Sequence, residues 1–193
     1  GSENVAVGLN ALFALTTGYN NVAISKNALG SIVNASQNIV NNITSIGIGF
    51  SAGNPSVNQP NQVGHIGDIF IGHQSGADQV YSNSTKNIFL GFRAGRNSGN
   101  SGSVLTSAEN VVIGAQAGLN VSGPDGSPLP FNRNIFIGKN AGHSTFGSDI
   151  QDNIILGSRG TDPLYLKAGN VVFHTGGFGN NIGIPSTNNV DGL

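Results

Sequence analysis

The stretch Asn134-Ile135-Phe136-Ile137-Gly138-Lys139-Asn140-Ala141-Gly142 decides the fold, because its pattern returns along most of the chain. It reads N-Φ-x-Φ-G-x-x-A-G, where Φ is an aliphatic residue. Copies or partial copies, spaced 17 to 24 residues apart up to Asn153, begin at Asn4, Asn21, Ser45, Asp68, Asn87, Asn110, Asn134 and Asn153, and degenerate ones begin at Asn170 and Asn181. A fixed element repeated at this period, with uneven loops between the copies, predicts a solenoid.

Each copy predicts a short strand between two corners. In Φ-x-Φ, both Φ side chains lie on one face of the strand and x lies on the other. The glycine after the strand suits a corner with positive φ, and the Ala-Gly pair suits a second, tight corner. The Asn before each strand is open to two interpretations: an amide ladder between rungs, or simply a good turn former. We therefore expect an all-β fold, a parallel β-roll or solenoid of about eight or more coils.

The apolar character of the x position predicts a homotrimer. We expect the Φ side chains to fill the interior of the coil, so that x points outward. A solvated strand face carries polar residues, but x is apolar or glycine in every copy. The second face then needs covering by other copies of the chain. The residues expected to face the partners in the trimer are Phe70, Phe89, Val112, Phe136 and Ile155.

Composition excludes several classes of function. The chain has 193 residues, a net charge of -1, no Cys and only 9% charged residues. Disulfides and thiolate metal sites are therefore excluded. The near-zero charge gives no general attraction to nucleic acid or to an anionic membrane. No apolar run is long enough to span a membrane, so we expect no membrane insertion.

The repeats also predict the domain organisation. Residues 1–2 are typical of a cloning remnant, and residues 3–160 form the β-roll repeat domain. Residues 161–193 are expected to form the C-terminal cap or tip from degenerate repeats, because Asp162-Pro163-Leu164-Tyr165-Leu166 interrupts the register. The inserts at 53–56, 97–102 and 122–128 are rich in Gly, Pro, Asn and Ser, which predicts loops.

The sequence contains one apparent catalytic motif and four His residues, but neither indicates a catalytic or metal site. Gly49-Phe50-Ser51-Ala52-Gly53 matches the G-x-S-x-G nucleophile elbow, but Ser51 occupies the variable slot that Arg93 and Gln116 hold in other copies. The four His residues lack metal-ligand spacing. We expect no enzymatic activity, no catalytic residue, no cofactor and no metal site.

The repeats resemble a known family. Leu15-Thr16-Thr17-Gly18-Tyr19-Asn20-Asn21-Val22-Ala23-Ile24, followed by Asn27-Ala28-Leu29, resembles the repeats of phage tail fibres and of similar fibre proteins in bacteria, including predatory ones. It is similar, more distantly, to the head repeats of trimeric autotransporter adhesins. The resemblance implies a left-handed, homotrimeric β-roll in an extracellular fibre, either a virion tail fibre or a bacterial surface fibre.

Recognition is expected in the segments between copies, because loops on rigid scaffolds carry function. Aromatic rings and polar donors suit a cell-surface glycan or protein receptor. The candidate ligand-binding residues are Tyr19, Tyr81, Arg93, Arg96, Phe131, Arg133, His143 and Phe146. For Phe131 and Phe146, packing under their own loops is the competing interpretation. The leading hypothesis is a trimeric fibre domain for host or cell-surface attachment. The alternatives are a tail-spike polysaccharide depolymerase and a purely structural fibre spacer.

Overall fold

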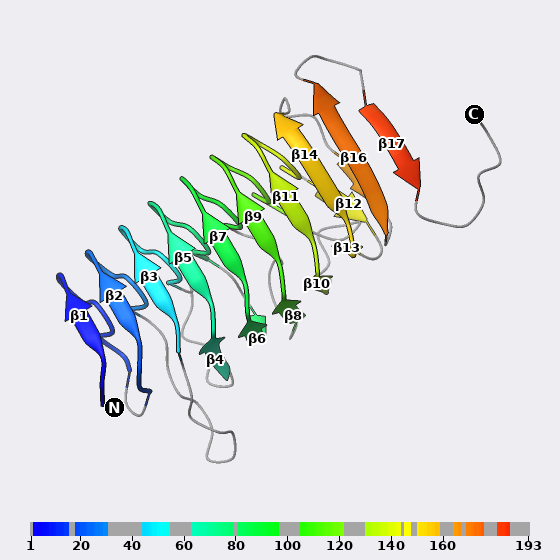
Figure 1. The fold of residues 1–193 in the computed structure, drawn as a ribbon. Coiled ribbons are helices and arrows are strands. Elements are labelled where there is room, and N and C mark those ends of the chain that lie inside the picture. The colour runs from blue at the N-terminus through cyan, green and yellow to red at the C-terminus, as the bar shows by residue number, and fades with distance from the viewer. Residues whose placement is uncertain are drawn as a thin grey trace.

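The computed structural model describes residues 2–15, 18–30, 44–54, 63–78, 81–96, 105–121, 130–143, 145–147, 150–158, 164–166, 169–175 and 181–185. These residues form an all-β structure without a helix. Seventeen strands are arranged in two long sheets and one two-stranded sheet. The strands of successive copies lie side by side along one axis (Figure 1). The prediction of a parallel β-solenoid is confirmed.

The main sheet contains the Φ-x-Φ strands in sequence order, and its register follows the repeat. Residues in equivalent places of successive copies are paired, as in Phe70 with Phe89 and Val112 with Phe136. All neighbours are parallel except the last two, which are antiparallel. The strands are β1 (Val5–Val7), β2 (Val22–Ile24), β3 (Ile46–Ile48), β5 (Ile69–Ile71), β7 (Ile88–Leu90), β9 (Val111–Ile113), β11 (Ile135–Ile137), β14 (Ile154–Ser158), β16 (Asn170–Thr175) and β17 (Asn181–Pro185).

A second parallel sheet forms from residues that precede the Asn of each copy. Its strands are β4 (Val63–Ile66), β6 (Tyr81–Thr85), β8 (Leu105–Ala108), β10 (Phe131–Asn132) and β13 (Ile150–Gln151). Each one leads directly into a strand of the main sheet, so five successive rungs carry a strand in both sheets. The smallest sheet pairs β12 (Thr145–Gly147) with β15 (Leu164–Leu166). This second sheet was not predicted from the sequence, and the inserts predicted as loops, at 53–56, 97–102 and 122–128, lie mostly outside the described residues.

The x side chains fill the interior of the chain's own coil. Phe70, Phe89, Val112, Phe136 and Ile155 are fully buried within one chain. They form one core with residues of the second sheet, such as Phe131, whose ring lies 5.6 Å from that of Phe136. The prediction that these five residues face partner chains is wrong. The reason is the strand alternation: the Asn before each strand points inward, so x shares its side and both Φ side chains point outward.

The recurring Asn forms a buried ladder, which confirms one of the two interpretations of this residue. The backbone N–H of Asn134 donates to Oδ1 of Asn110 (2.9 Å), and its side-chain Nδ2 donates to the same oxygen (3.0 Å). The arrangement repeats from Asn110 to Asn87 and from Asn153 to Asn134. Each amide therefore fixes the register of the next rung while it satisfies buried polar groups.

The first corner requires glycine in most rungs because successive rungs touch there through their backbones. Gly91 has φ +134°, a conformation that L side chains rarely adopt. A Cβ at this position would lie 2.6 Å from the carbonyl oxygen of Gly114 in the next rung. Glycine at the first corner therefore allows successive rungs to touch through their backbones.

Candidate recognition surface

The outward side of the main sheet is a continuous apolar surface, which we call the aliphatic face. It consists of the Φ residues, whose side chains are half-buried or exposed; from β2 to β14 the x residue between them is buried. Val7 is 56% exposed, Ile71 40% and Ile137 39%. Its members from β1 to β14 are Val5, Val7, Val22, Ile24, Ile46, Ile48, Ile69, Ile71, Ile88, Leu90, Val111, Ile113, Ile135, Ile137, Ile154 and Leu156. A surface of this kind on a protein marks an interaction site.

Three aromatic rings, which we call the ring stack, follow the corner glycines of β3, β5 and β7. The ring of His73 lies between those of Phe50 and Phe92, with centroids 5.1 Å and 5.3 Å away. The interplanar angles of 18° and 20° are those of stacked rings. Phe50 is 37% exposed and Phe92 44%. The ring stack therefore forms an exposed ridge one corner away from the aliphatic face.

Arg93 lies beside the ring stack. Its guanidinium lies 4.9 Å from the ring centroid of Phe92, within the range of a cation–π contact. Its Nε donates a hydrogen bond to Oε1 of Gln74 on the preceding rung (3.1 Å). Arg93 is thus near an exposed aromatic group, as a binding site would require, but its guanidinium is already engaged by the scaffold.

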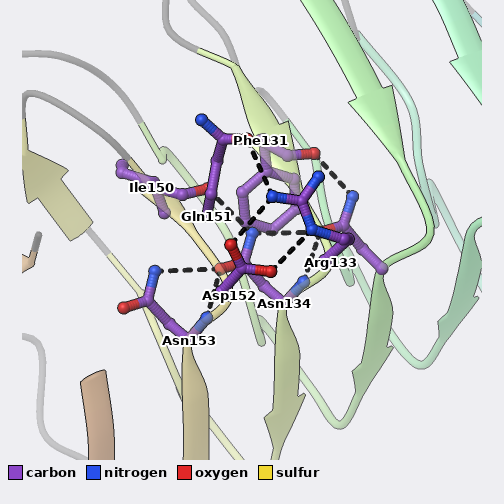
Figure 2. A network of polar contacts seen from close by, with 8 residues as sticks. Phe131, Arg133, Asn134, Ile150, Gln151, Asp152 and Asn153 are labelled. Carbon is purple, nitrogen blue, oxygen red and sulfur yellow. Dashed lines mark hydrogen bonds and ion pairs between the residues drawn. The ribbon is translucent and has the colours of Figure 1, made fainter. Parts of the chain in front are cut away.

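The other arginines among the candidates also join neighbouring rungs. Arg96 donates from Nε to Oδ2 of Asp78 at 2.7 Å, and both side chains are partly buried. Arg133 contacts both carboxylate oxygens of Asp152, at 2.6 Å from Nε and 2.8 Å from a terminal nitrogen (Figure 2). These pairs connect residues 18 and 19 positions apart, one turn of the solenoid. The pattern favours a structural role for both side chains.

The Arg133–Asp152 pair belongs to a column of alternating charge at the corner before the main sheet. The column runs Lys86, Glu109, Arg133 and Asp152, all with φ between +54° and +60°. Lys86 pairs with Glu109 at 3.3 Å. The hydrogen bond from Arg133 lowers the pKa of Asp152, and its positive charge adds to this effect. Both pairs are exposed, so each contributes little to stability.

The remaining candidates do not gather into one site. Phe131 is 1% exposed and packs in the core, so the prediction that it binds a ligand is wrong and the competing interpretation holds. Tyr19 and His143 are half-buried, in different turns of the chain. Tyr81 lies on β6 and Phe146 on β12, but their side chains are outside the described residues.

Sequence reasoning missed the ring stack and the outward direction of the Φ residues. A signal for the ring stack was present, because three consecutive copies carry Phe50, His73 and Phe92 directly after the corner glycine. The inward direction of x followed from the Asn ladder, once the ladder was accepted over the turn interpretation. The ring stack was therefore readable from the repeat register, whereas the inward direction of x depended on the choice between the two interpretations of the Asn.

Within the described part of the chain, no group of three or more His, Asp or Glu side chains could hold a metal ion. The same residues include no helix that is long and apolar enough to cross a membrane. Comparison with known proteins gave no match: no protein-family model, no curated protein and no solved structure matches this chain.

Proposed function

We propose that the chain is a domain of a homotrimeric extracellular fibre, from a virion tail or a bacterial surface, that attaches to a cell surface. The observation that carries this proposal is the aliphatic face. Its two columns of outward Val, Ile and Leu run along β1 to β14, a surface that stays unsatisfied in a single chain. Copies packed around a common axis parallel to the solenoid would cover it on every chain.

The contacts between successive rungs support the proposal that the domain is part of a stiff fibre. Buried Asn side chains and corner glycines bind each rung to the next, which gives a rod rather than a flexible array. The main sheet stacks the eight Φ-x-Φ strands from β1 to β14, and we propose that each of them belongs to one coil of the solenoid. We propose a left-handed coil, as in the fibres that the repeats resemble.

Attachment is assigned to the segments between copies. The arginines of the candidate set hold neighbouring rungs together, and Phe131 lies in the core. Of the candidate residues, Tyr19, Tyr81, His143 and Phe146 remain as proposed contacts with a glycan or protein receptor. The scaffold presents these segments at regular steps along the fibre, so weak individual contacts add up by avidity.

Two measurements test the proposal. One chain has a mass of 19.6 kDa, and analytical ultracentrifugation of the purified chain should give three times this mass. A monomer at micromolar concentration contradicts the trimer. A glycan array and binding to candidate bacterial cells then test attachment. Silence in both assays favours a spacer without a ligand. If the trimer depolymerises a capsular polysaccharide, its function is that of a tail-spike enzyme rather than attachment.

A further inference from the structure

The main sheet ends differently at β1 and at β17, which lie at opposite ends of the row of strands (Figure 1). At one end, β17 pairs with β16 in the antiparallel direction, whereas the strands from β1 to β16 are parallel to one another. At the other end, β1 is an intact copy of the repeat and has a neighbouring strand on one side only. An uncovered edge of this kind is a template for a further strand.

The edge of β1 presents three backbone N–H groups that have no hydrogen-bond partner among the described residues. They belong to Asn4, Gly8 and Asn10. The equivalent groups of the next rung all donate to the rung of β1: Asn21 to Oδ1 of Asn4 (2.9 Å), Ser25 to the carbonyl of Val7 (2.7 Å) and Asn27 to the carbonyl of Leu9 (2.9 Å). The same set of bonds recurs in every rung from β3 to β11. The three groups are therefore placed to donate to a rung stacked outside β1.

The interior of the coil is also open at this end. Ala6 is exposed, whereas Ala23, which holds the same inward place in β2, is fully buried. Val7 is 56% exposed, and Ile24, which holds its place in the next rung, is 37% exposed. The terminal units of repeat proteins normally carry a polar outer face, which keeps them soluble. An apolar terminal unit is instead suited to stacking against another unit, which would take this apolar surface out of water.

We propose that this end of the solenoid docks a further coil of the same N-Φ-x-Φ-G repeat, stacked in parallel on β1. The contact already exists within the chain, because β1 presents outward the same N–H groups and the same inward alanine that β2 presents to β1. The proposed contact continues the stacking that the main sheet makes from β1 to β14. It is independent of the proposed trimer, since the edge of β1 lies at the end of the row of strands and not on the aliphatic face.

The partners of the three N–H groups define the occupant. Asn4 needs a side-chain oxygen at the ladder position, a place that Asn, Ser and Asp fill in this chain. A Cβ on Gly8 would lie 2.6 Å from the carbonyl carbon of Ser25 in the rung it touches. By the same geometry, the corner of the occupant must carry glycine or another small residue where it touches Gly8. Its strand must run parallel to β1, so that its carbonyls lie opposite the N–H groups of Gly8 and Asn10.

A second copy of the chain meets these conditions poorly. If it is stacked end to end in the same direction, it offers β17, which runs against the parallel strands and therefore against β1. If two copies pair through their β1 edges, a two-fold axis relates them and the two strands are antiparallel. Asn4 of one copy then lies at the opposite end of the strand pair from Asn4 of the other, and the ladder is interrupted. A parallel coil continues the ladder.

Hydrogen exchange of the full chain with one added coil tests the proposal. The extension is a second copy of residues 4–20, inserted directly before Asn4, so that its strand lies outside β1 as β1 lies outside β2. Mass spectrometry with electron-transfer fragmentation follows single N–H groups. We expect the N–H groups of Gly8 and Asn10 to exchange at least a hundredfold more slowly in the extended chain than in the unmodified one.

Two control extensions make the test specific. One has the same composition in scrambled order and should leave Gly8 and Asn10 unprotected. In the other, alanine replaces the copy of Asn4, which should make the original Asn4 N–H exchange at least tenfold faster than in the extended chain while Gly8 stays slow. Gly91 and Arg93, which hold the places of Gly8 and Asn10 in a central rung, are the reference and should exchange slowly in every chain.

Three results would overturn the proposal. The first is rapid exchange of Gly8 and Asn10 in the extended chain while the reference groups stay slow. The second is equal protection by the scrambled extension, because any added chain would then cover the end. The third is slow exchange of both groups in the unmodified chain, since the end is then already covered; a doubled mass in ultracentrifugation would identify a second copy as the cover.

Discussion

Gly95 closes the second corner of its rung directly against the ring of Phe89. A Cβ on Gly95 would lie 2.6 Å from Cδ2 of Phe89, closer than real Cβ atoms approach. Gly118 holds the same place one rung later with an almost identical backbone, φ +59° against +63°. There the core residue is Val112, and a Cβ would lie 3.2 Å from its side chain. The inward residue of a rung thus determines how small its second corner must be.

This relationship predicts different costs for the same substitution. Gly95→Ala must displace the ring of Phe89 in a packed core, and we expect a loss of about 2–4 kcal/mol in the free energy of unfolding. Gly118→Ala carries the same backbone strain with more space, and we expect about 1–2 kcal/mol. Urea denaturation of the two variants measures the difference. Equal losses would mean that the backbone, not the ring, sets the cost.

In the first two rungs the inward residue is small and the residue at the second corner is large. Their x residues are Ala6 and Ala23, and the second corner carries Leu12 or Leu29 in place of glycine. Leu29 is fully buried and reaches the next rung, where a Cβ on Gly47 would lie 2.7 Å from its Cγ. A small inward residue therefore accompanies a large corner residue, which keeps the coil interior filled.

The repeat alone predicts the strands of the main sheet, their order and both corners. It did not determine which face of each strand points inward, because Φ-x-Φ with apolar x fits either direction. The inward Asn settles this, since alternation places it on the side of x. The strands of the second sheet also escaped prediction. Their sequences, such as Tyr81–Thr85 and Leu105–Ala108, do not repeat, and they pair only because the main sheet brings them into register.

The candidate site was predictable only in part. Arg93 and Arg96 looked like surface donors in an irregular segment, but partners one turn away engage both of them. A sequence separation of 18 or 19 residues between partners is visible only after the coil period is known at that point. Arg93 and Gln74 hold the same place in successive copies, so the repeat register allows their contact to be assigned. Arg96 and Asp78 hold places one residue apart, so their contact could not be assigned in this way.

The Asn ladder predicts a large cost for removing one buried amide. Asn110 is fully buried; its Oδ1 accepts two hydrogen bonds from Asn134, and its Nδ2 donates to Oδ1 of Asn87 and to the carbonyl of Phe131. In Asn110→Ala these groups lose a buried partner. We expect a loss of about 2–4 kcal/mol in the free energy of unfolding, measured by urea denaturation.

The control for this prediction is an exposed amide. Asn10 donates to Asn27 at 3.3 Å on the surface, with φ +58°. Asn10→Gly removes that bond without straining the backbone, and we expect a change of about 0.5 kcal/mol or less. A comparable loss in both variants would contradict the view that buried amides fix the register.

The aliphatic face predicts where a charge disrupts assembly. Ile71→Lys places an ammonium in the middle of the proposed interface, where an unpaired buried charge costs several kcal/mol. We expect the trimer to dissociate at a concentration about a hundredfold higher or more, measured by ultracentrifugation. The control is Thr85→Lys, on the outward side of β6 in the second sheet, which should leave the mass unchanged. A trimer unaffected by Ile71→Lys would place the contact elsewhere.

The Arg133–Asp152 pair predicts a small, signed pH dependence of stability. The hydrogen bond from Arg133 holds the pKa of Asp152 below the ordinary value of an aspartate, although partial desolvation acts in the opposite direction. The pair therefore stabilises the fold above that ordinary value, and this contribution is lost as the pH falls through the lower pKa of the folded chain. Both side chains are about half exposed, so the contribution is about 0.5 kcal/mol or less.

In Arg133→Gln, NMR titration should show the pKa of Asp152 rising toward its ordinary value. Lys86→Gln, which removes the charge from the neighbouring pair, should leave the titration of Asp152 unchanged. If Lys86→Gln raises the pKa of Asp152 as much as Arg133→Gln does, the charge column as a whole, not the direct hydrogen bond, lowers it.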